Sequence, residues 1–425
     1  MENFVEELRW RGMIHQDMPG TEEALMKAMT AGYVGFDPTA VSLHVGNLIP
    51  IMMLVHFQRS GHKPYALVGG ATGMIGDPSG KSAERNLLSE EILKANQEGV
   101  RKQLEQFLDF DCGENSAEIV NNYDWFREMD VLSFLRDVGK HLTVNYMMAK
   151  ESVKKRIETG ISFTEFSYQL IQGYDYYYLY KNKNCKIQMG GSDQWGNITS
   201  GTELIRRMGQ GEAYALTCKL LTKADGSKFG KSEGGNIWLD PEMTTPYQFY
   251  QFWLNTADDD VVKFIRIFSL LPKEEIEALE KEHHVDPSKR ILQEALAKDV
   301  TSRVHSPEEY EKAFLSSKVL FGNKGADILK GLDVEKIKAV FDGVPHFTVS
   351  KADIESEIEV ITFLSTTGIY ASNGEARRAL KANAVAVNKV KVNDAKKITK
   401  DDLLAGRFIV VQKGKKVYNL VELVD

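Results

Sequence analysis

The chain has 425 residues, of which 43% are hydrophobic and 27% are charged, and its net charge is −7. This length predicts two to four globular domains, and the acidic balance excludes a global attraction to nucleic acid. Basic residues gather, however, between residues 375 and 418, which hold 12 Lys and Arg against 4 Asp and Glu. We therefore expect one surface for a polyanion on a body that binds something small.

The three cysteines, Cys112, Cys185 and Cys218, show no CxxC spacing. They argue against a disulfide framework and a cysteine zinc site, and they fit a reducing compartment. The acidic N-terminal segment lacks the apolar core of a signal peptide, and the longest uncharged apolar run, 48–55, is too short to cross a bilayer. We therefore expect a cytoplasmic protein without a membrane segment.

The predicted elements begin with helical spacing over residues 1–30. Strands are predicted at 33–36, 64–69 and 186–190, with an apolar helix from about His44 and helical cover at 86–160. The strand, helix, strand order indicates a parallel sheet, and such sheets bind ligands at the carboxyl ends of their strands. The rest of the chain is predicted as helices from 246 to about 322, a linker at 342–352, and two helices with short strands from 354.

The first candidate motif is His44-Val-Gly46-Asn47, just after Asp37-Pro-Thr39. A helix start presents unpaired N–H groups that suit phosphate, and Gly46 lets a flat ligand approach the backbone. The alternative is an ordinary capped helix with a histidine at the surface.

The second is the glycine-rich stretch from Gly69 to Lys81. It is not a P-loop, because only three residues separate Gly76 from the Gly-Lys pair and that motif needs four. What remains is a loop at a strand end whose Asp77, Lys81 and Arg85 could bind an amino group and phosphates. The alternative is a plain flexible loop.

Two further motifs follow. Tyr168, Gln172 and Asp175 fall on one helical face, which indicates either a polar pocket or a solvated side of an amphipathic helix. In Gly190-Gly191-Ser-Asp193-Gln194, glycines at a strand end admit a ligand and Asp193 could accept from ribose hydroxyls, although a tight turn has the same composition.

The last is Lys223-Ala-Asp-Gly226-Ser-Lys228-Phe-Gly-Lys231. Its glycines allow movement, and its lysines could clamp a polyphosphate in a transition state. A solvated charged loop is the alternative.

Together these motifs resemble class I aminoacyl-tRNA synthetases, specifically the bacterial-type tyrosyl enzymes, over essentially the whole chain. His44-Val-Gly-Asn47 resembles the HIGH signature, and Lys228-Phe-Gly-Lys231-Ser232 resembles the KMSKS signature. The resemblance implies an α/β fold with a Rossmann-like parallel-sheet catalytic domain, followed by an α-helical domain and a small α+β RNA-binding domain. It implies a tyrosine–tRNA ligase that makes tyrosyl-adenylate from ATP, with Mg²⁺, and passes tyrosine to tRNA(Tyr). It implies no structural metal.

The resemblance also implies roles for single residues. Tyr33 and Asp175 would bind the phenol. The amino acid's ammonium and carboxylate groups would be held by Asp77, Tyr168, Gln172 and Gln194. The ATP and adenylate contacts would come from Asp37, Gly46, Gly191, Asp193 and Lys231. Among the catalytic residues, Thr39 and His44 would stabilise the γ-phosphate and the pentavalent phosphorus, and Asn47 would contact the ribose. The cations on the pyrophosphate would be Lys81, Arg85, Lys228 and Lys231.

This sequence departs from the family pattern at three places. Asn47 replaces the second histidine of HIGH, although its amide can still donate to a ribose oxygen. Val34 replaces a cysteine often found there and removes a weak sugar contact. Pro50 costs no hydrogen bond if it lies in the first helical turn and otherwise kinks the helix.

The resemblance implies a catalytic domain with a dimer-interface insertion at 1–220, followed by a mobile loop and its connector at 221–245. A helical anticodon-binding domain would follow at 246–340. A linker at 341–353 would lead to an S-four-like RNA-binding domain at 354–425. In the last, Arg377, Arg378 and Lys381 would contact RNA phosphates, unless they form only a solvated basic face. The family is homodimeric.

Two rival readings are a non-catalytic RNA-binding protein that kept this fold and a related synthetase for tryptophan. The intact His44, Lys228 and Lys231 disfavour the first. The pair Tyr33 and Asp175, which suits a phenol, disfavours the second.

Overall fold

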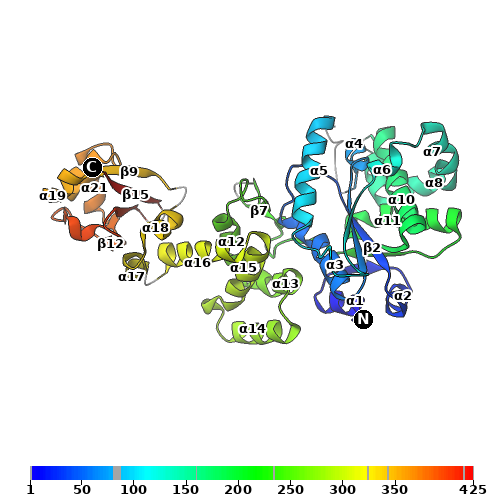
Figure 1. Ribbon diagram of the computed structural model, residues 1–425, viewed down its shortest axis with the longest axis horizontal. Coiled ribbons are helices and arrows are strands. Elements are labelled where there is room, and N and C mark those ends of the chain that lie inside the picture. The colour runs from blue at the N-terminus through cyan, green and yellow to red at the C-terminus, as the bar shows by residue number, and fades with distance from the viewer. Residues whose placement is uncertain are drawn as a thin grey trace. The chain divides into compact units, whose positions relative to one another are not determined.

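The computed structural model describes residues 2–79, 88–158, 160–232, 235–322, 325–341, 344–414 and 417–424 (Figure 1). The chain forms two compact units. The first comprises residues 1–245 and 252–305, and the second comprises residues 246–251 and 306–425. Among the described helices, none combines the length and apolar character needed to span a bilayer.

A six-stranded sheet with the order β1-β6-β5-β2-β3-β4 forms the centre of the first unit. All described neighbours in it are parallel except β1, which is antiparallel to β6. The chain places β3 and β4 on one side of β2, and β5 and β6 on the other. This reversal between β2 and β5 opens a crevice at the carboxyl ends of the strands, where α/β proteins bind ligands. The strands are β1 (Ile14–Asp17), β2 (Ala31–Phe36), β3 (Lys63–Val68), β4 (Glu118–Asn121), β5 (Cys185–Gly191) and β6 (Tyr214–Cys218).

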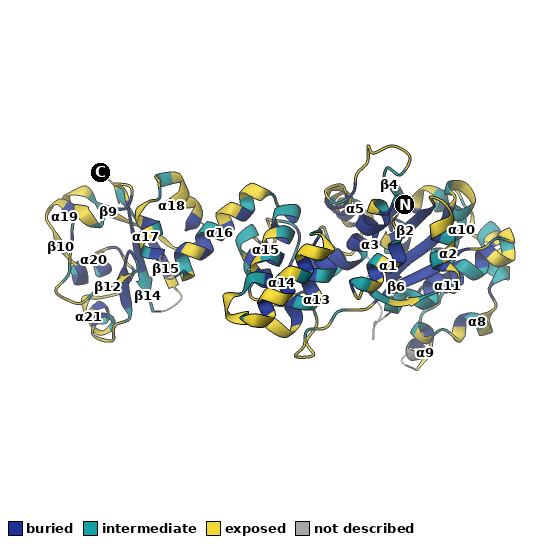
Figure 2. Cartoon of the chain, turned by 90° about the horizontal axis from the view of Figure 1, so that it is seen from below, coloured by how far each residue is buried: buried dark blue, intermediate teal, exposed yellow. Residues whose placement is uncertain are grey.

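Helices α3 (Leu48–Arg59) and α10 (Phe163–Lys183) cover opposite faces of this sheet. Successive residues of a strand point to opposite faces. A side chain at Gly32 would lie 2.8 Å from an aromatic ring of α3, whereas the ring of Tyr33 packs edge-on against Tyr176 of α10 at 5.5 Å between centroids. Both faces of β2 are therefore buried, as the dark blue strands of Figure 2 show, and the strand is a nearly continuous apolar run.

Two short strands lie where helices were predicted. Strand β1 lies between α1 (Phe4–Trp10) and α2 (Thr21–Lys27), and β4 follows α5 (Glu90–Leu104). Each has four residues, none of them fully buried. Their sequences thus carry no clear alternation, and pairing with a neighbouring strand decides their conformation.

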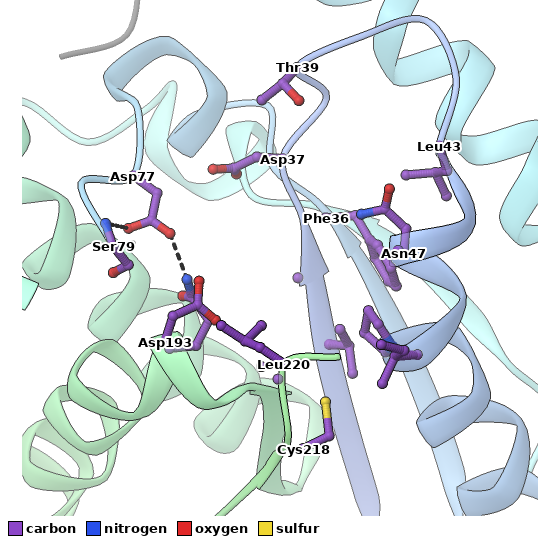
Figure 3. A pocket seen from close by; sticks show the side chains of 18 of the residues that line it. Phe36, Asp37, Thr39, Leu43, Asn47, Asp77, Ser79, Asp193, Cys218 and Leu220 are labelled. Carbon is purple, nitrogen blue, oxygen red and sulfur yellow. Dashed lines mark hydrogen bonds between the residues drawn. The ribbon is translucent and has the colours of Figure 1, made fainter. Parts of the chain in front are cut away.

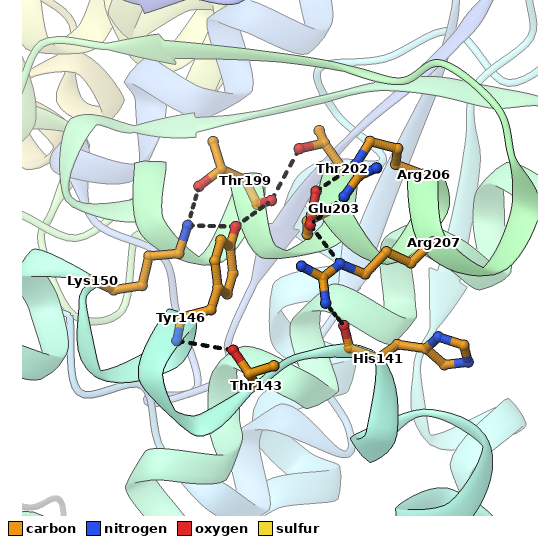
Figure 4. A network of polar contacts seen from close by, with 9 residues as sticks. All are labelled: His141, Thr143, Tyr146, Lys150, Thr199, Thr202, Glu203, Arg206 and Arg207. Carbon is orange, nitrogen blue, oxygen red and sulfur yellow. Dashed lines mark hydrogen bonds and ion pairs between the residues drawn. The ribbon is translucent and has the colours of Figure 1, made fainter.

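Polar contacts connect a helical insertion between β4 and α10 to the rest of the first unit (Figure 4). Lys150 Nζ donates to Tyr146 Oη and Thr199 Oγ1, both at 2.8 Å. Arg207 Nη1 donates to the carbonyl of His141 at 2.8 Å. The insertion is thereby fixed against the helix that follows β5. The helices concerned are α6 (Tyr123–Phe126), α7 (Val131–Asp137), α8 (Val144–Met148), α9 (Glu151–Ile157) and α11 (Trp195–Leu204).

The helical stretch expected as one domain over 246–340 is divided between the two units, within α12 and again after residue 305. The first unit holds most of the earlier helices, and the second holds the later ones, which pack on the C-terminal sheet. These helices are α12 (Pro246–Leu254), α13 (Asp258–Phe268), α14 (Lys273–Val285), α15 (Ile291–Val304), α16 (Pro307–Phe321), α17 (Gly325–Lys330) and α18 (Val334–Val340).

The second unit contains a five-stranded sheet with the order β12-β11-β14-β15-β9. Along β14, Phe408 and Val410 join the core beneath α16–α18, whereas Ile409 and Val411 join the core beneath the helices on the other face. The sheet is therefore buried on both faces. Its strands are β9 (His346–Ser350), β11 (Val385–Val387), β12 (Val390–Lys391), β14 (Phe408–Lys413) and β15 (Val417–Val424), and the other helices are α19 (Lys351–Glu355), α20 (Val360–Thr366) and α21 (Asn373–Lys381).

The segment 341–353, predicted as a linker, contains β9 and the start of α19. Strand β9 pairs in parallel with β15, with His346 opposite Leu420. This segment is therefore an edge of the C-terminal sheet, formed with the last strand of the chain.

Candidate active site

A cavity of about 850 Å³ lies at the carboxyl ends of β2 and β5 in the first unit (Figure 3). It brings together side chains from all five motifs, which are far apart in the sequence. The predicted site residues that line it are Tyr33, Asp37, Thr39, His44, Gly46, Asn47, Asp77, Tyr168, Gln172, Asp175, Gly191, Asp193, Gln194 and Lys228.

The part of the cavity beside the middle of β2 contains two deeply buried polar groups, Tyr33 and Asp175, each 1% exposed. Asp175 accepts hydrogen bonds from Asn122 Nδ2 at 3.0 Å and Trp125 Nε1 at 2.9 Å. Burial nevertheless raises the pKa of the Asp175 carboxyl to about 8.

The Tyr33 hydroxyl has no hydrogen-bond partner within the described ranges. Burial, together with the negative charge of Asp175, raises its pKa well above the usual value for tyrosine. A buried hydroxyl without a partner costs free energy, so a polar ligand group that hydrogen-bonds to Tyr33 would remove that cost.

A chain of hydrogen bonds connects Asp175 to the carboxyl end of β2. Asn122 Nδ2, which contacts Asp175, is also 3.0 Å from Thr72 Oγ1. Thr72 Oγ1 donates to Asp37 Oδ1 at 2.7 Å, and Tyr168 Oη donates to Asp37 Oδ2 at 2.8 Å. Tyr168 and Asp37 are thus held by each other, and two ends of the cavity share one polar network.

A third carboxylate, Asp77, lies across the cavity from Asn47 in Figure 3. Gln194 Nε2 donates to its Oδ2 at 2.6 Å, and the backbone N–H of Ser79 donates to its Oδ1 at 2.9 Å. Asn197 Nδ2 lies 3.3 Å from Oδ1. These donors fix the orientation of a negative group, which suits a cationic ligand group. Two predicted phosphate ligands from the same loop, Lys81 and Arg85, lie outside the described residues.

The His44 motif forms the 3₁₀ turn η1 (Val45–Asn47) at the start of α3. His44 Nδ1 accepts from the Gly46 N–H at 3.0 Å, and Asn47 Oδ1 accepts from the His44 N–H at 3.0 Å. The two side chains therefore form a capping box. Pro50 is the third residue of α3, where no intrahelical donor is needed, so it causes no loss of hydrogen bonding.

Glycines keep the cavity open at two points. A side chain at Gly46 would lie 2.7 Å from the His44 ring, and one at Gly191 would lie 2.6 Å from Asp193 Oδ1. A side chain at Gly46 would therefore displace the His44 ring from its hydrogen bond, and one at Gly191 would require the Asp193 carboxylate to move aside.

The lysine loop reaches the cavity with one of its two predicted cations. Lys228 lines the cavity, whereas Lys231 is exposed in the short strand β7 (Lys231–Ser232) and is not among the lining residues. The predicted RNA ligands Arg377, Arg378 and Lys381 are exposed on α21 in the second unit.

Sequence reasoning missed Asn122, Trp125, Thr72 and Ser79. Asn122 directly follows β4, so the rule that ligands gather at strand ends would have indicated it had β4 been recognised. Trp125 belongs to the insertion, which was read as helical cover.

Two family models match the chain: residues 27–322 match "tRNA synthetases class I (W and Y)", and residues 336–421 match "Tyrosine--tRNA ligase SYY-like C-terminal domain". The chain is 62% identical to a tyrosine–tRNA ligase of Cytophaga hutchinsonii over 424 residues, which cover 99% of each chain. It is 58% identical to one of Flavobacterium johnsoniae, which covers 100% of each chain.

Among solved structures, a C-terminally truncated mitochondrial tyrosyl-tRNA synthetase of Aspergillus nidulans is similar, with a TM-score of 0.68 and 31% identity. The match covers 76% of this chain and 95% of that one. The topology, the cavity at the sheet reversal and the full-length similarity agree, and the chain belongs to the class I tRNA synthetases for tryptophan and tyrosine.

Proposed function

We propose that this chain is a tyrosine–tRNA ligase. It activates L-tyrosine with ATP, releasing pyrophosphate, and transfers tyrosine from the adenylate to the 3′ end of tRNA(Tyr). The observation that carries the choice of tyrosine is the buried pair of Tyr33, whose hydroxyl has no described partner, and Asp175 in the same cavity. Full-length similarity to tyrosine–tRNA ligases supports the same choice.

The phenol of the substrate donates its hydrogen bond to Asp175 and accepts one from the hydroxyl of Tyr33. Asn122 and Trp125 hold the carboxylate for this contact. Phenylalanine would leave both protein groups buried without that partner, so the site rejects it.

The charged end of the amino acid lies toward Asp77, Tyr168 and Gln172. Asp77 supplies the negative charge for the ammonium group, and the Oε1 atom of Gln172 has no partner within the described residues, so it can accept from the same group. Gln194, which donates to Asp77, lies near the carboxylate that attacks ATP.

ATP binds over the start of α3 and the ends of β2 and β5, where Asp37, Gly46, Gly191 and Asp193 contact the nucleotide and its ribose. A carboxylate oxygen of tyrosine forms a bond to the α-phosphorus while the bond from that phosphorus to the pyrophosphate oxygen breaks. Negative charge develops on the phosphoryl oxygens during this step. Thr39 and His44 stabilise them, and the amide of Asn47 donates to a ribose oxygen. The cations Lys81, Arg85, Lys228 and Lys231 neutralise the departing pyrophosphate.

This chemistry needs positioned donors and cations rather than a nucleophilic side chain. Mg²⁺ enters with ATP and balances its phosphate charge. In the described part of the chain, His, Cys, Asp and Glu side chains form no group of three that could hold a metal ion.

We assign binding of tRNA to the helices after residue 246, as the anticodon-binding part, and to residues 354–425. Arg377, Arg378 and Lys381 share one exposed side of α21, while Ala376 and Leu380 of the same helix are buried. Such a face suits an RNA backbone. We infer a cytoplasmic enzyme from its similarity to bacterial tyrosine–tRNA ligases.

We further infer a homodimer through the insertion between β4 and α10. Val131 and Leu132 on α7 and Phe163 at the start of α10 are 72%, 77% and 76% exposed. An apolar group of this kind on helices with a common core favours a protein interface. The variant Leu132→Asp with Phe163→Asp should sediment as a monomer, whereas Val285→Asp, an equally exposed position on α14, should sediment like the wild type; a wild-type dimer in both would refute this interface.

The experiment that tests the function is ATP–pyrophosphate exchange with tyrosine, tryptophan and phenylalanine. Tyrosine should drive exchange, and Tyr33→Phe should reduce the preference for tyrosine over phenylalanine by roughly two- to tenfold, the range for one neutral hydrogen bond. Tyr65→Phe is the matched control, because Tyr65 is a buried tyrosine opposite Tyr33 on β3 that does not line the cavity.

Exchange with tryptophan but not tyrosine would favour the tryptophan enzyme. No exchange with any amino acid, but retained tRNA binding, would favour the non-catalytic reading.

A further inference from the structure

The loop that carries Lys228 is a small hairpin with little support of its own. Thr222 and Lys228 form an antiparallel bridge, and the Lys223 N–H donates to the Ser227 carbonyl at 2.9 Å. Every residue from Ala224 to Lys228 is exposed. An isolated hairpin of this size is at best marginally stable in water, so its position must come from contacts with other elements.

Helix α13 supplies two polar contacts to this hairpin. The carboxylate of Asp260, which is 5% exposed, accepts from the Ala224 N–H with both oxygens, at 3.0 and 3.1 Å. Lys263 Nζ donates to the Thr222 carbonyl at 3.0 Å. A buried carboxylate needs a donor, and here the backbone of the hairpin provides one.

An aromatic contact anchors the other end of the hairpin. The ring of Phe229 stacks on Phe268 at 5.2 Å with an angle of 15°, and it packs edge-on against Phe264 at 4.9 Å. Both of these rings belong to α13, and Phe229 also contacts Phe252 and Trp253 of α12, each at 5.9 Å between centroids. Because Phe229 is the residue after Lys228, this packing also limits where the Lys228 side chain can begin.

The far end of α13 is itself held firmly. Arg11 Nη1 donates to the carbonyls of Arg266 and Ser269 at 2.5 and 2.8 Å, and Arg303 Nη1 donates to that of Phe268 at 3.0 Å. Two guanidinium groups, one from the residue that follows α1 and one from α15, thus satisfy carbonyls at the C-terminus of the helix. The base under the hairpin is therefore rigid.

The hairpin also meets the His44 motif. A side chain at Gly230 would lie 3.0 Å from Val45 Cγ2 and 3.4 Å from the Gly46 nitrogen. The Gly230 carbonyl accepts from the Ile237 N–H at 3.1 Å, and the Ile237 carbonyl accepts from the Val45 N–H at 2.9 Å. The contacts with α13 therefore determine where the hairpin lies relative to the His44 turn, which contacts ATP in the proposed function.

We propose that Asp260 is a positioning residue for amino-acid activation, which acts by holding the Lys228 hairpin on α13 against the His44 turn, with Phe229 as the apolar anchor. The inference rests on the function proposed above, in which Lys228 neutralises pyrophosphate. Asp260 does not line the cavity, so its effect passes through the hairpin.

The test compares Asp260→Ala, Asp260→Asn, Lys228→Ala and the double variant Asp260→Ala/Lys228→Ala in pyrophosphate exchange. Asp259→Ala is the matched control, because Asp259 is an exposed carboxylate in the same helical turn. Loss of a hydrogen bond to a charged group corresponds to roughly a ten- to hundredfold effect. We expect kcat of Asp260→Ala to fall by about that factor, with an unchanged KM for tyrosine, while Asp259→Ala matches the wild type.

Asp260→Asn, which keeps one carbonyl acceptor, should recover most of the rate. The double variant should be no slower than Lys228→Ala, because the two residues act through one element. Trypsin should cut after Lys223 and Lys228 faster in Asp260→Ala than in Asp259→Ala. If the two variants melt at the same temperature, a change in global stability cannot explain this difference.

If Lys228→Ala activates tyrosine at the wild-type rate, the role proposed for Lys228 fails. If Lys228→Ala is slow but Asp260→Ala keeps its kcat, or if the two effects multiply, the positioning role of Asp260 is overturned. Should Asp260→Ala fold poorly, Phe229→Leu gives a second test. Because Phe229 itself lines the cavity, the measurement there is cleavage by trypsin after Lys223 and Lys228, which should be faster than in the wild type; a wild-type cleavage rate would equally overturn the proposal.

Discussion

The raised pKa of Asp175 predicts that tyrosine binding depends on pH. Asp175 has a pKa of about 8 because it is buried, so about nine-tenths of the empty sites carry a protonated carboxyl at pH 7. The phenol of tyrosine is a donor and binds best to the ionised carboxylate. Binding should therefore lower the pKa of Asp175 and release its proton.

The magnitude follows from the ionised fraction. For a pKa of about 8 this fraction rises about ninefold from pH 6 to pH 7, and less than twofold from pH 8 to pH 9. Since the apparent dissociation constant varies inversely with the competent fraction, the Kd for tyrosine should fall about ninefold between pH 6 and 7, about fivefold more between pH 7 and 8, and level off above pH 8.

Isothermal titration calorimetry measures both effects. At pH 7, titrations in buffers of different ionisation enthalpy should show release of about 0.9 proton per tyrosine, the protonated fraction for a pKa of about 8. Asp175→Asn, which cannot titrate, should bind more weakly and show neither the proton release nor the slope. An affinity that stays flat from pH 6 to 8, with no proton released, would refute the assignment of the phenol to Asp175.

Three further predictions concern the pH dependence of stability, the contact with ATP and the binding of tRNA. The Asp175 carboxyl binds its proton more tightly in the folded than in the unfolded protein, so the stability of the ligand-free protein should fall as pH rises from about 4 to 8, and Asp175→Asn should flatten this slope in thermal melts. Asn47→Asp keeps the acceptor of the capping box but loses the amide donor, so it should melt like the wild type and activate tyrosine more slowly; an unchanged exchange rate would exclude a contact from the amide to ATP. Arg377→Glu with Arg378→Glu should leave pyrophosphate exchange intact and lower tRNA charging at least tenfold, because two phosphate contacts are lost; a matching loss of exchange would contradict this division.

The ends of the parallel strands were predictable because they follow a general rule. Asp37 follows β2, the glycine-rich loop follows β3, and Gly191 ends β5, so the parallel order alone placed these groups at one edge of the sheet. Each of these strand-end motifs was ambiguous alone, but the order of the strands was enough to predict that they meet in one cavity.

The remaining parts of the site depend on contacts that local sequence does not encode. Asn122 reaches Asp175 only because β4 pairs with β3, and the four residues of β4 show no alternation that would reveal a strand. Strand β9 likewise forms by pairing with β15 at the end of the chain. Such non-local pairing overrides the local composition that predicted a linker.

The count of basic residues between 375 and 418 includes one lysine, Lys389, whose charged group binds within the protein. Lys389 Nζ donates to the carbonyls of Val319 and Leu320, both at 2.6 Å, at the end of α16. Burial lowers the pKa of this lysine. Lys389 therefore satisfies helix carbonyls inside the second unit, and its charge does not belong to the exposed basic surface of that unit.

One face of helix α10 explains how the cavity could bind both ends of an amino acid. Tyr168 and Asp175 share a face of α10 and are seven residues apart, a rise of about 10 Å along the axis. Tyr168 is bonded to Asp37 at the end of β2, and Asp175 is bonded to Asn122 and lies with Tyr33 in the buried part of the cavity. In the function proposed above, the same face would reach from the adenylate to the phenol. A shift of α10 by one turn would move Tyr168 and Asp175 together. The spacing between the groups that would bind the two ends of the amino acid is therefore fixed by a rigid helix rather than by a loop.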